Sequence, residues 1–244
     1  MAPAIKNDSA PPSPPSKSLG TALPYAARTA LHLKGLVPSA VENFAAQEAR
    51  AYEQFQAKGT PLEQYIFLSW LRNTNLDLFY RLVLKHLKEI APVIYTPTVG
   101  QACQEFSHIY PFLAPPSAVD GLYIPLNEVD NIDEIINNYK ESIPEGQQPE
   151  ITVITDGSRI LGLGDLGMNG MGIPVGKLQL YVAAAGLDPT RCLPIVLDFG
   201  TDNPKYLEDP LYLGIRQKRP EDPEFYAATE KVLNGLTRAF PEIF

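Results

Sequence analysis

The sequence has few of the residues that build disulfide frameworks and metal sites. It contains two cysteines, Cys103 and Cys192, and three histidines among 244 residues. Two distant cysteines favour reduced thiols that serve as small buried apolar side chains of an intracellular protein. No histidine or cysteine stands in an H-x-x-x-H or C-x-x-C frame, so the sequence shows no metal site built from these residues.

Long hydrophobic runs and excess positive charge are also missing. No apolar run reaches the roughly 18–20 residues that span a bilayer, so no membrane association is expected. The formal net charge of −8 repels phosphate backbones, so nucleic acid is not expected as a partner. The amino terminus lacks the apolar stretch of a secretory signal and the arginine-rich pattern of a transit peptide. We therefore expect a soluble cytoplasmic protein, with a mitochondrial location as the alternative.

Proline, by contrast, is abundant, and it shapes the amino terminus. The segment "MAPAIKNDSAPPSPPSKSLG" is rich in proline, which forbids a helix, and its serine and lysine residues keep it solvated. Residues 1–20 are therefore expected to form a disordered tail.

Residues 21–92 show the apolar spacing of helices. Ser39 and Glu42 are placed as a capping box ahead of "AVENFAAQEARAYEQFQAKG". In "PLEQYIFLSWLRNTNLDLFYRLVLKHLKEIAP" the Asn-Thr-Asn sequence interrupts the pattern. Two helices joined near residues 73–75 therefore fit better than one.

In residues 93–244 short apolar runs alternate with helical segments. "GLYIPL", "EITVITDG" and "CLPIVLDFG" indicate strands, and "PVIYTPTVG" fits a short strand and turn. Helices are expected over "NIDEIINNYKES", with Asn131 and Glu134 as a capping box, and over "PVGKLQLYVAAAGL" and "PEFYAATEKVLNGLTRAF". This alternation predicts an α/β fold, in which a helical N-terminal region precedes a mostly parallel sheet with flanking helices.

The run "RILGLGDLGMNGMGIPVGK" (Arg159–Lys177) contains G-x-G-x-x-G and ends in Gly-Lys. A dinucleotide fingerprint needs a helix at once, and a helix is not expected to begin at the third glycine and keep three more glycines inside. It also needs an acidic residue about 20 positions on, which is missing. A phosphate-binding loop fails because its first glycine falls on Met171 and its hydroxyl residue on Leu178.

A long, tightly turning loop after the strand would explain the glycines but not the charged residues around them. A loop after a strand lies at the carboxyl edge of the sheet, where ligands bind. Lys177 is expected in the first turn of a helix that begins at one of residues 174–176, either as a general base or as a solvated surface lysine. Asp165 and Asp198 fit structural roles in organising their turns.

Four long motifs in the same order resemble the malic enzymes. They are "YTPTVGQACQEFSHIY", "TDGSRILGLGDLG", "GMGIPVGKLQLYVAAAGLDPTRCLPIVLDFGTDN" and "DPLYLGIRQKR", and the resemblance extends from about Arg28 to Phe240. It implies a domain like the N-terminal domain of amino-acid dehydrogenases. It also implies oxidation of L-malate with NAD or NADP, decarboxylation of the bound oxaloacetate to pyruvate with Mg²⁺ or Mn²⁺, and assembly as a homodimer or homotetramer.

The resemblance assigns roles to three residues. Lys177 matches the general base that acts on the 2-hydroxyl of malate. Tyr95 matches the acid that protonates C3 of the enolpyruvate. Arg159 matches the arginine that binds a substrate carboxylate and approaches the cofactor, a task that suits a planar guanidinium.

The family's further functional residues do not follow within these 244 residues. In malic enzymes, the metal-binding Glu-Asp pair and the NAD(P)-binding domain come after the last helix seen here. We therefore expect the main cofactor-binding and metal-binding residues to be absent and the chain alone to be inactive. It is expected to be part of a longer malic enzyme. The alternatives are a non-catalytic module that dimerises with or regulates a full-length malic enzyme, and a malolactic enzyme, which shares these motifs but releases lactate.

Overall fold

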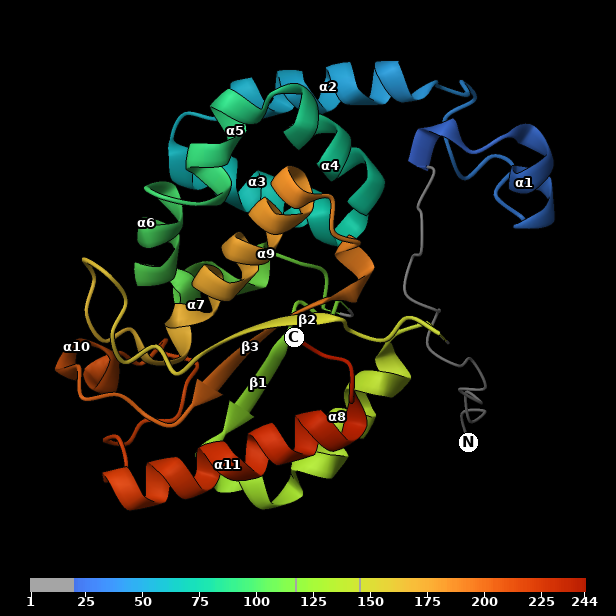
Figure 1. The fold of residues 1–244 in the computed structure, drawn as a ribbon. Helices are drawn as coiled ribbons and strands as arrows, with labels where there is room; N and C mark the ends of the chain where they lie inside the picture. Colours follow the sequence, from blue (N-terminus) through green and yellow to red (C-terminus); the bar gives the residue numbers. More distant parts are fainter. Residues whose placement is uncertain (1–19, 117, 145) are drawn as a thin grey trace, which may run out of the picture.

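The computed structural model describes residues 20–116, 118–144 and 146–244 (Figure 1). The tail expected over residues 1–20 lies outside these ranges, apart from Gly20, which opens a short 3-10 helix, Gly20–Ala22. Within the described ranges, no helix is long and apolar enough to cross a membrane.

Helices fill the first half of the described chain, in the upper part of Figure 1. They are α1 (Tyr25–Ala30), α2 (Phe44–Gln56), α3 (Pro61–Thr74), α4 (Leu76–Lys85), α5 (Leu87–Ile94), α6 (Thr98–Gln104), α7 (Phe106–Ile109) and the 3-10 helix Tyr110–Phe112. Helical structure therefore continues well beyond residue 92.

Asparagine and threonine side chains set the limits of α3 and α4. The break expected near residues 73–75 is confirmed, because Asn75 ends α3 and caps α4 by accepting a hydrogen bond from the Leu78 N–H at 3.1 Å. A capping box formed by Thr60 and Glu63, which was not predicted from the sequence, begins α3.

The two capping boxes expected from the sequence are wrong. The box at Ser39 and Glu42 fails because α2 begins after Asn43, whose side chain caps it. The Glu42 carboxylate binds an arginine of α2 instead. The box at Asn131 and Glu134 fails because Asn131 makes no capping hydrogen bond, although it does stand at the start of α8.

The strand expected over "PVIYTPTVG" is also wrong, although the expected turn is present at residues 96–97. Pro92 lies inside α5, and α6 begins at Thr98, so helices occupy both sides of a short turn. Within α5, Ile90, Val93 and Ile94 are buried at the i, i+3, i+4 spacing of a helix. Burial of that helical face decides the local structure in place of strand preference.

The second half of the chain contains a parallel sheet, which confirms the expected α/β class. Its strands are β1 (Leu122–Pro125), β2 (Ile151–Thr155) and β3 (Cys192–Asp198). They lie in the order β1-β3-β2, with Ile195 of the central strand opposite both Leu122 and Ile154. The remaining helices are the 3-10 helices Leu126–Asn131, Gly167–Met171 and Pro189–Arg191, and α8 (Ile132–Ser142), α9 (Gly172–Ala185), α10 (Pro204–Glu208) and α11 (Asp222–Ala239).

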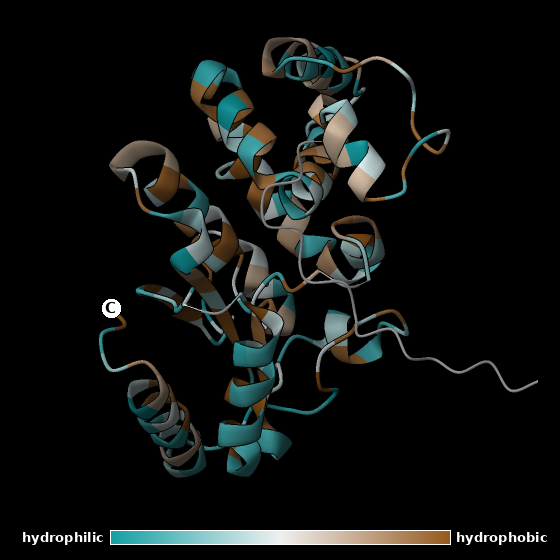
Figure 2. Ribbon diagram, turned by 90° about the vertical axis from the view of Figure 1, so that its right-hand side faces the viewer, coloured by the Kyte–Doolittle hydropathy of each residue, from teal (hydrophilic) through white to brown (hydrophobic). Residues whose placement is uncertain are grey.

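The central strand β3 divides its side chains between two layers. Ile195 and Leu197 face a cluster formed with α8 and α11, whereas Val196 faces a second cluster that includes the N-terminal helices. Figure 1 shows α8 and α11 below the sheet and α9 above it. In Figure 2, α11 at the lower left mixes hydrophilic and hydrophobic residues, as is typical of a helix with one buried side.

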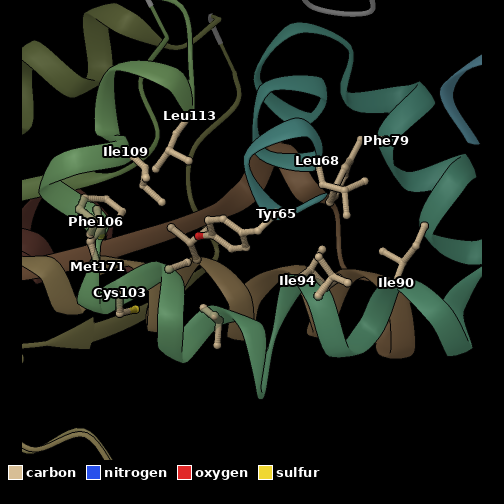
Figure 3. Close-up of a cluster of buried hydrophobic side chains, with 14 of the residues drawn as sticks. Tyr65, Leu68, Phe79, Ile90, Ile94, Cys103, Phe106, Ile109, Leu113 and Met171 are labelled. Carbon is tan, nitrogen blue, oxygen red and sulfur yellow. The ribbon is translucent and has the colours of Figure 1, made fainter. Parts of the chain in front are cut away.

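One hydrophobic cluster joins the N-terminal helices to the start of α9. Figure 3 shows Tyr65 of α3, Ile94 of α5 and Cys103 of α6 in this cluster, together with Met171. Val175 of α9 belongs to the same cluster. Close packing of these side chains holds α5 and α6 against α9, and the candidate site lies where the end of α5 meets α9.

A buried arginine shapes the segment that precedes α2. Arg28 is 4% exposed, and its guanidinium donates five hydrogen bonds to the backbone carbonyl oxygens of Leu23, Pro38, Ser39, Thr21 and Ala40. A guanidinium has five N–H donors. Polar contacts to one side chain therefore organise residues 21–40, where Leu31 and Leu36 remain exposed.

Candidate active site

The end of α5 lies directly against α9. A Cβ atom added at Gly176 would stand 2.8 Å from the Ile94 carbonyl oxygen and 2.8 Å from the ring carbon Cδ2 of Tyr95. The Tyr95 ring therefore lies over Gly176, the residue next to Lys177. The structure thus brings two of the three expected site residues, Tyr95 and Lys177, to neighbouring positions.

The Tyr95 phenol keeps its proton at neutral pH. Burial raises its pKa above the ordinary value of 10.0, and the nearby Tyr181 and Cys103 raise it further. Tyr181 follows Lys177 by one helical turn on α9. A half-buried, protonated phenol beside a lysine can act as a proton donor to a bound substrate.

Lys177 is half-buried on α9. The first-turn position expected from the sequence is wrong, because α9 begins at Gly172 and Lys177 falls in its second turn. The field of the helix dipole is therefore weaker at Lys177 than in the first turn. Within the described residues, no hydrogen bond or ion pair engages the Lys177 ammonium group, which leaves it able to contact a ligand.

The helical backbone begins much earlier than the glycine content suggested. The 3-10 helix Gly167–Met171 runs directly into α9, so helical structure does begin at the third glycine and keeps three more glycines inside. A Cβ atom at Gly172 would stand 2.7 Å from Cys103 Sγ, and one at Gly176 would meet α5. Close packing through these glycines outweighs their low helix propensity.

The start of this helical run does not offer a phosphate site. The Gly167 N–H donates to Asp165 Oδ1 at 2.9 Å, and the Met168 N–H donates to the Tyr212 hydroxyl at 2.9 Å. The two donor residues, Gly167 and Met168, are buried. A phosphate at a helix N-terminus needs free N–H groups. The dinucleotide interpretation therefore fails because these donors are occupied, a reason that the sequence did not reveal.

Arg159 lies in the loop between β2 and the 3-10 helix, and its side chain is exposed. A tight turn follows it, in which the Ile160 N–H donates to the Gly164 carbonyl oxygen at 2.8 Å. Among the described residues, no hydrogen bond or ion pair engages Arg159. The structure therefore places the Tyr95 ring against Gly176, the residue next to Lys177, but among the described residues it shows no interaction of Arg159 with Tyr95 or Lys177.

The structural roles expected for Asp165 and Asp198 are confirmed. Asp165 caps Gly167 and accepts a hydrogen bond from the Asp202 N–H at 2.8 Å. Asp198 Oδ2 accepts from the Ile215 N–H at 2.8 Å. The other Asp198 oxygen is buried and has no hydrogen-bond partner among the described residues, and burial raises the pKa of this carboxyl above its ordinary value.

Arg219, which was not predicted from the sequence, binds Asp156 and Asp165 at the two ends of the loop that carries Arg159. Arg219 lies near the end of the last quoted motif. No spacing rule connects Arg219 to a loop that lies more than fifty positions earlier in the chain, so its ion pairs with Asp156 and Asp165 could not be predicted from the sequence.

The described residues do not fit a complete metal site by themselves. No group of three or more His, Cys, Asp or Glu side chains among them could hold a metal ion. His108 pairs with Asp209 at 2.8 Å, and His86 lies 3.5 Å from Glu48. Each of these clusters offers fewer ligands than a divalent ion needs.

A protein-family model, the malic enzyme N-terminal domain, matches residues 72–244. This range contains Tyr95, Arg159 and Lys177. The match therefore covers the whole candidate site and more than half of the chain.

Curated relatives give the same result. An NAD-dependent malic enzyme of Idiomarina loihiensis is 44% identical over 229 residues, which cover 94% of this chain and 39% of that protein. An NADP-dependent malic enzyme of Dictyostelium discoideum is 46% identical over 229 residues, which cover 94% of this chain and 40% of that protein. The chain thus spans about 40% of the length of these relatives. On the family model and these identities together, the chain belongs to the malic enzyme family.

Proposed function

We propose that this chain supplies the acid, the base and a substrate-binding arginine of an enzyme that converts L-malate to pyruvate and CO₂. The observation that carries the proposal is the packing of Tyr95 on Gly176, beside Lys177. Relatives of similar identity are named NAD-dependent and NADP-dependent, so the proposal includes either nicotinamide cofactor. It also includes Mg²⁺ or Mn²⁺, a cytoplasmic location and assembly as a homodimer or homotetramer.

Lys177 is the general base of this proposal. Oxidation of the secondary alcohol of malate removes the hydroxyl proton and the hydrogen on C2, the latter as a hydride. Lys177 in its deprotonated form accepts the hydroxyl proton. Among the described residues, no group of three or more His, Cys, Asp or Glu side chains could hold a metal ion, so we assign these residues no part in hydride transfer or in metal binding beyond the approach of Arg159 to the cofactor.

Tyr95 is the general acid. Loss of CO₂ from oxaloacetate, a 2-keto acid whose ketone lies β to the departing carboxylate, leaves the enolate of pyruvate, and C3 must then receive a proton to give pyruvate. The raised pKa of Tyr95 keeps this proton on the phenol until then. Lys177, protonated in the first step, can return a proton to the phenolate, which restores both groups for the next turnover.

Arg159 binds a substrate carboxylate. Its guanidinium is exposed and, within the described chain, unpaired. Two parallel N–H groups can hold both oxygens of a carboxylate, a geometry that a lysine cannot reproduce.

A chimera tests these roles. Residues 1–244 replace the matching segment of the Dictyostelium relative, and malate-dependent NADPH formation is measured with Mn²⁺. We expect Lys177→Ala to lower kcat by about 10²-fold or more, and Arg159→Ala to raise KM for malate by about tenfold or more. Tyr181→Phe is the control for a nearby phenol and should be nearly silent.

Tyr95→Phe should reduce pyruvate formation strongly. Wild-type activity in both Tyr95→Phe and Lys177→Ala would reject the proposal, and lactate as the product would identify a malolactic enzyme. The isolated 244-residue chain should form no NAD(P)H from malate, and turnover by that chain would show that it holds a complete site.

A further inference from the structure

The loop that carries Arg159 is held at both ends by one side chain. Arg219 Nη1 lies 3.2 Å from Asp156 Oδ2, and its Nη2 donates to the Asp156 carbonyl oxygen at 3.0 Å. The same guanidinium binds the far end of the loop, where Nη2 and Nε donate to the two carboxylate oxygens of Asp165 at 2.7 and 3.1 Å. In Figure 1 this loop is the yellow segment at the left, beside α10.

Arg219 is itself fixed in place. Its side chain is 12% exposed, and its backbone N–H donates to Asp202 Oδ1 at 3.3 Å. The Asp202 N–H in turn donates to Asp165 Oδ2 at 2.8 Å, and Asn203 Nδ2 donates to the Asp165 carbonyl oxygen at 2.9 Å. These contacts hold the guanidinium and the end of the loop in one rigid unit.

Asp165 and Arg219 form a charged pair. Burial on its own would raise the pKa of Asp165, but hydrogen bonds from Arg219, Asp202 and Gly167 outweigh burial and lower it. Asp165 is therefore ionised at neutral pH, and its bonds to Arg219 are charge-assisted.

The backbone of the loop is closed at its base. The Leu166 N–H donates to the Gly157 carbonyl oxygen at 2.9 Å. A Cβ atom at Gly157 would stand 2.0 Å from the Gly167 carbonyl oxygen, so the two ends of the loop touch. Arg159, near the middle, is exposed and has no hydrogen bond or ion pair to any described residue. The loop is thus fixed at its base and presents a free guanidinium.

We propose that Arg219 is a positioning residue, which closes the base of this loop and holds the Arg159 guanidinium in place for a carboxylate substrate. The proposal rests on the function assigned to Arg159 above for the identity of the ligand. It predicts that a side chain with one cationic centre cannot replace Arg219, because a lysine ammonium cannot bind both ends of the loop in this fixed arrangement.

Hydrogen exchange of the 244-residue chain tests closure of the loop. We expect Arg219→Ala to increase exchange of the amides of residues 157–166 by about tenfold or more, because it removes charge-assisted hydrogen bonds. Arg219→Lys should give an intermediate increase. Arg238→Ala is the matched control, since it removes an exposed ion pair with Asp133 on α8, and it should leave the loop unchanged.

Binding of L-malate tests the positioning role. In NMR spectra of the folded chain, malate should shift the Arg159 Nε signal, and a several-fold higher malate concentration should be needed in Arg219→Lys. This comparison is made at a temperature at which both proteins are fully folded, so a loss of overall stability would not change it. Arg219→Lys also keeps the test decisive if Arg219→Ala does not fold.

Unchanged loop exchange in a folded Arg219 variant would overturn the proposal. Faster amide exchange together with unchanged malate affinity would support closure of the loop by Arg219 but would overturn its role in positioning Arg159. Absence of any malate shift at Arg159 in the wild-type chain would instead reject the function assigned to Arg159, and with it the carboxylate ligand named here. The exchange measurements test closure of the loop independently of malate. A failure of loop closure can therefore be distinguished from a failure of carboxylate binding by Arg159.

Discussion

Cys103 Sγ lies so close to Gly172 that a Cβ atom added to this glycine would stand only 2.7 Å from the sulfur. Cys103 is completely buried, and burial raises the pKa of its thiol to about 12. The expectation of a small apolar role is therefore confirmed for this cysteine. The pair brings α6 into direct contact with α9.

We predict that Gly172→Ala destabilises the chain by about 1–3 kcal/mol through overpacking, and that Cys103→Ala relieves part of this loss. Urea unfolding of the two single variants and the double variant measures the coupling. Strictly additive effects would show that the two atoms do not meet.

The destabilisation caused by Gly176→Ala should be harder to relieve with a second substitution. Its new methyl group would meet the Ile94 carbonyl oxygen and the Tyr95 ring at 2.8 Å, and a backbone atom cannot be moved by rotating a side chain. We expect a lower melting temperature and a more exposed Tyr95, seen by near-UV circular dichroism. Cys103→Ala should not rescue this variant, and rescue would contradict the assigned contact.

Asp198→Asn should stabilise the chain increasingly as the pH rises. The pKa of Asp198 is raised by burial from 3.8, so the folded state binds the proton more tightly than the unfolded state does. Stability conferred by the protonated form is therefore lost as the pH rises from about 4 through the raised pKa. Free energies of unfolding between pH 4 and 7 should diverge in favour of the variant, whereas a constant difference would exclude this cause.

Arg28→Ala should release residues 21–40 without unfolding the core. The substitution removes five hydrogen bonds to backbone carbonyl oxygens and leaves those acceptors without their buried donor. Exchange of amides in this segment should rise to the level of an open chain. Arg50→Ala, at an exposed ion pair, is the control, and equal exchange in the two variants would count against the role of Arg28.

The sequence predicted those elements whose signals are local. Short apolar runs identified all three strands of the described sheet, because buried parallel strands are apolar on both faces. The end of α9 at Gly186 was also predictable, since Gly186 adopts the left-handed conformation, φ +73°, that ends many helices.

The errors arose where distant segments meet. Glycine propensity argued against the helical run from Gly167, but contacts with α5 and α6 require small residues there. Strand preference favoured "PVIYTPTVG", but burial of Ile94 in the helical core prevailed. Arg219 gave no signal because its partners lie far back in the chain. For the site itself, only the resemblance to malic enzymes singled out Tyr95.

The alternation of side chains along β3 makes this strand far more sensitive to a change in length than to a change in composition. Replacing Val196 with another apolar residue alters one contact on one side of the sheet. Deleting it would shift every following residue by one position and exchange the faces on which Leu197 and its successors lie. Insertions and deletions should therefore be excluded from β3, even where its individual residues tolerate substitution.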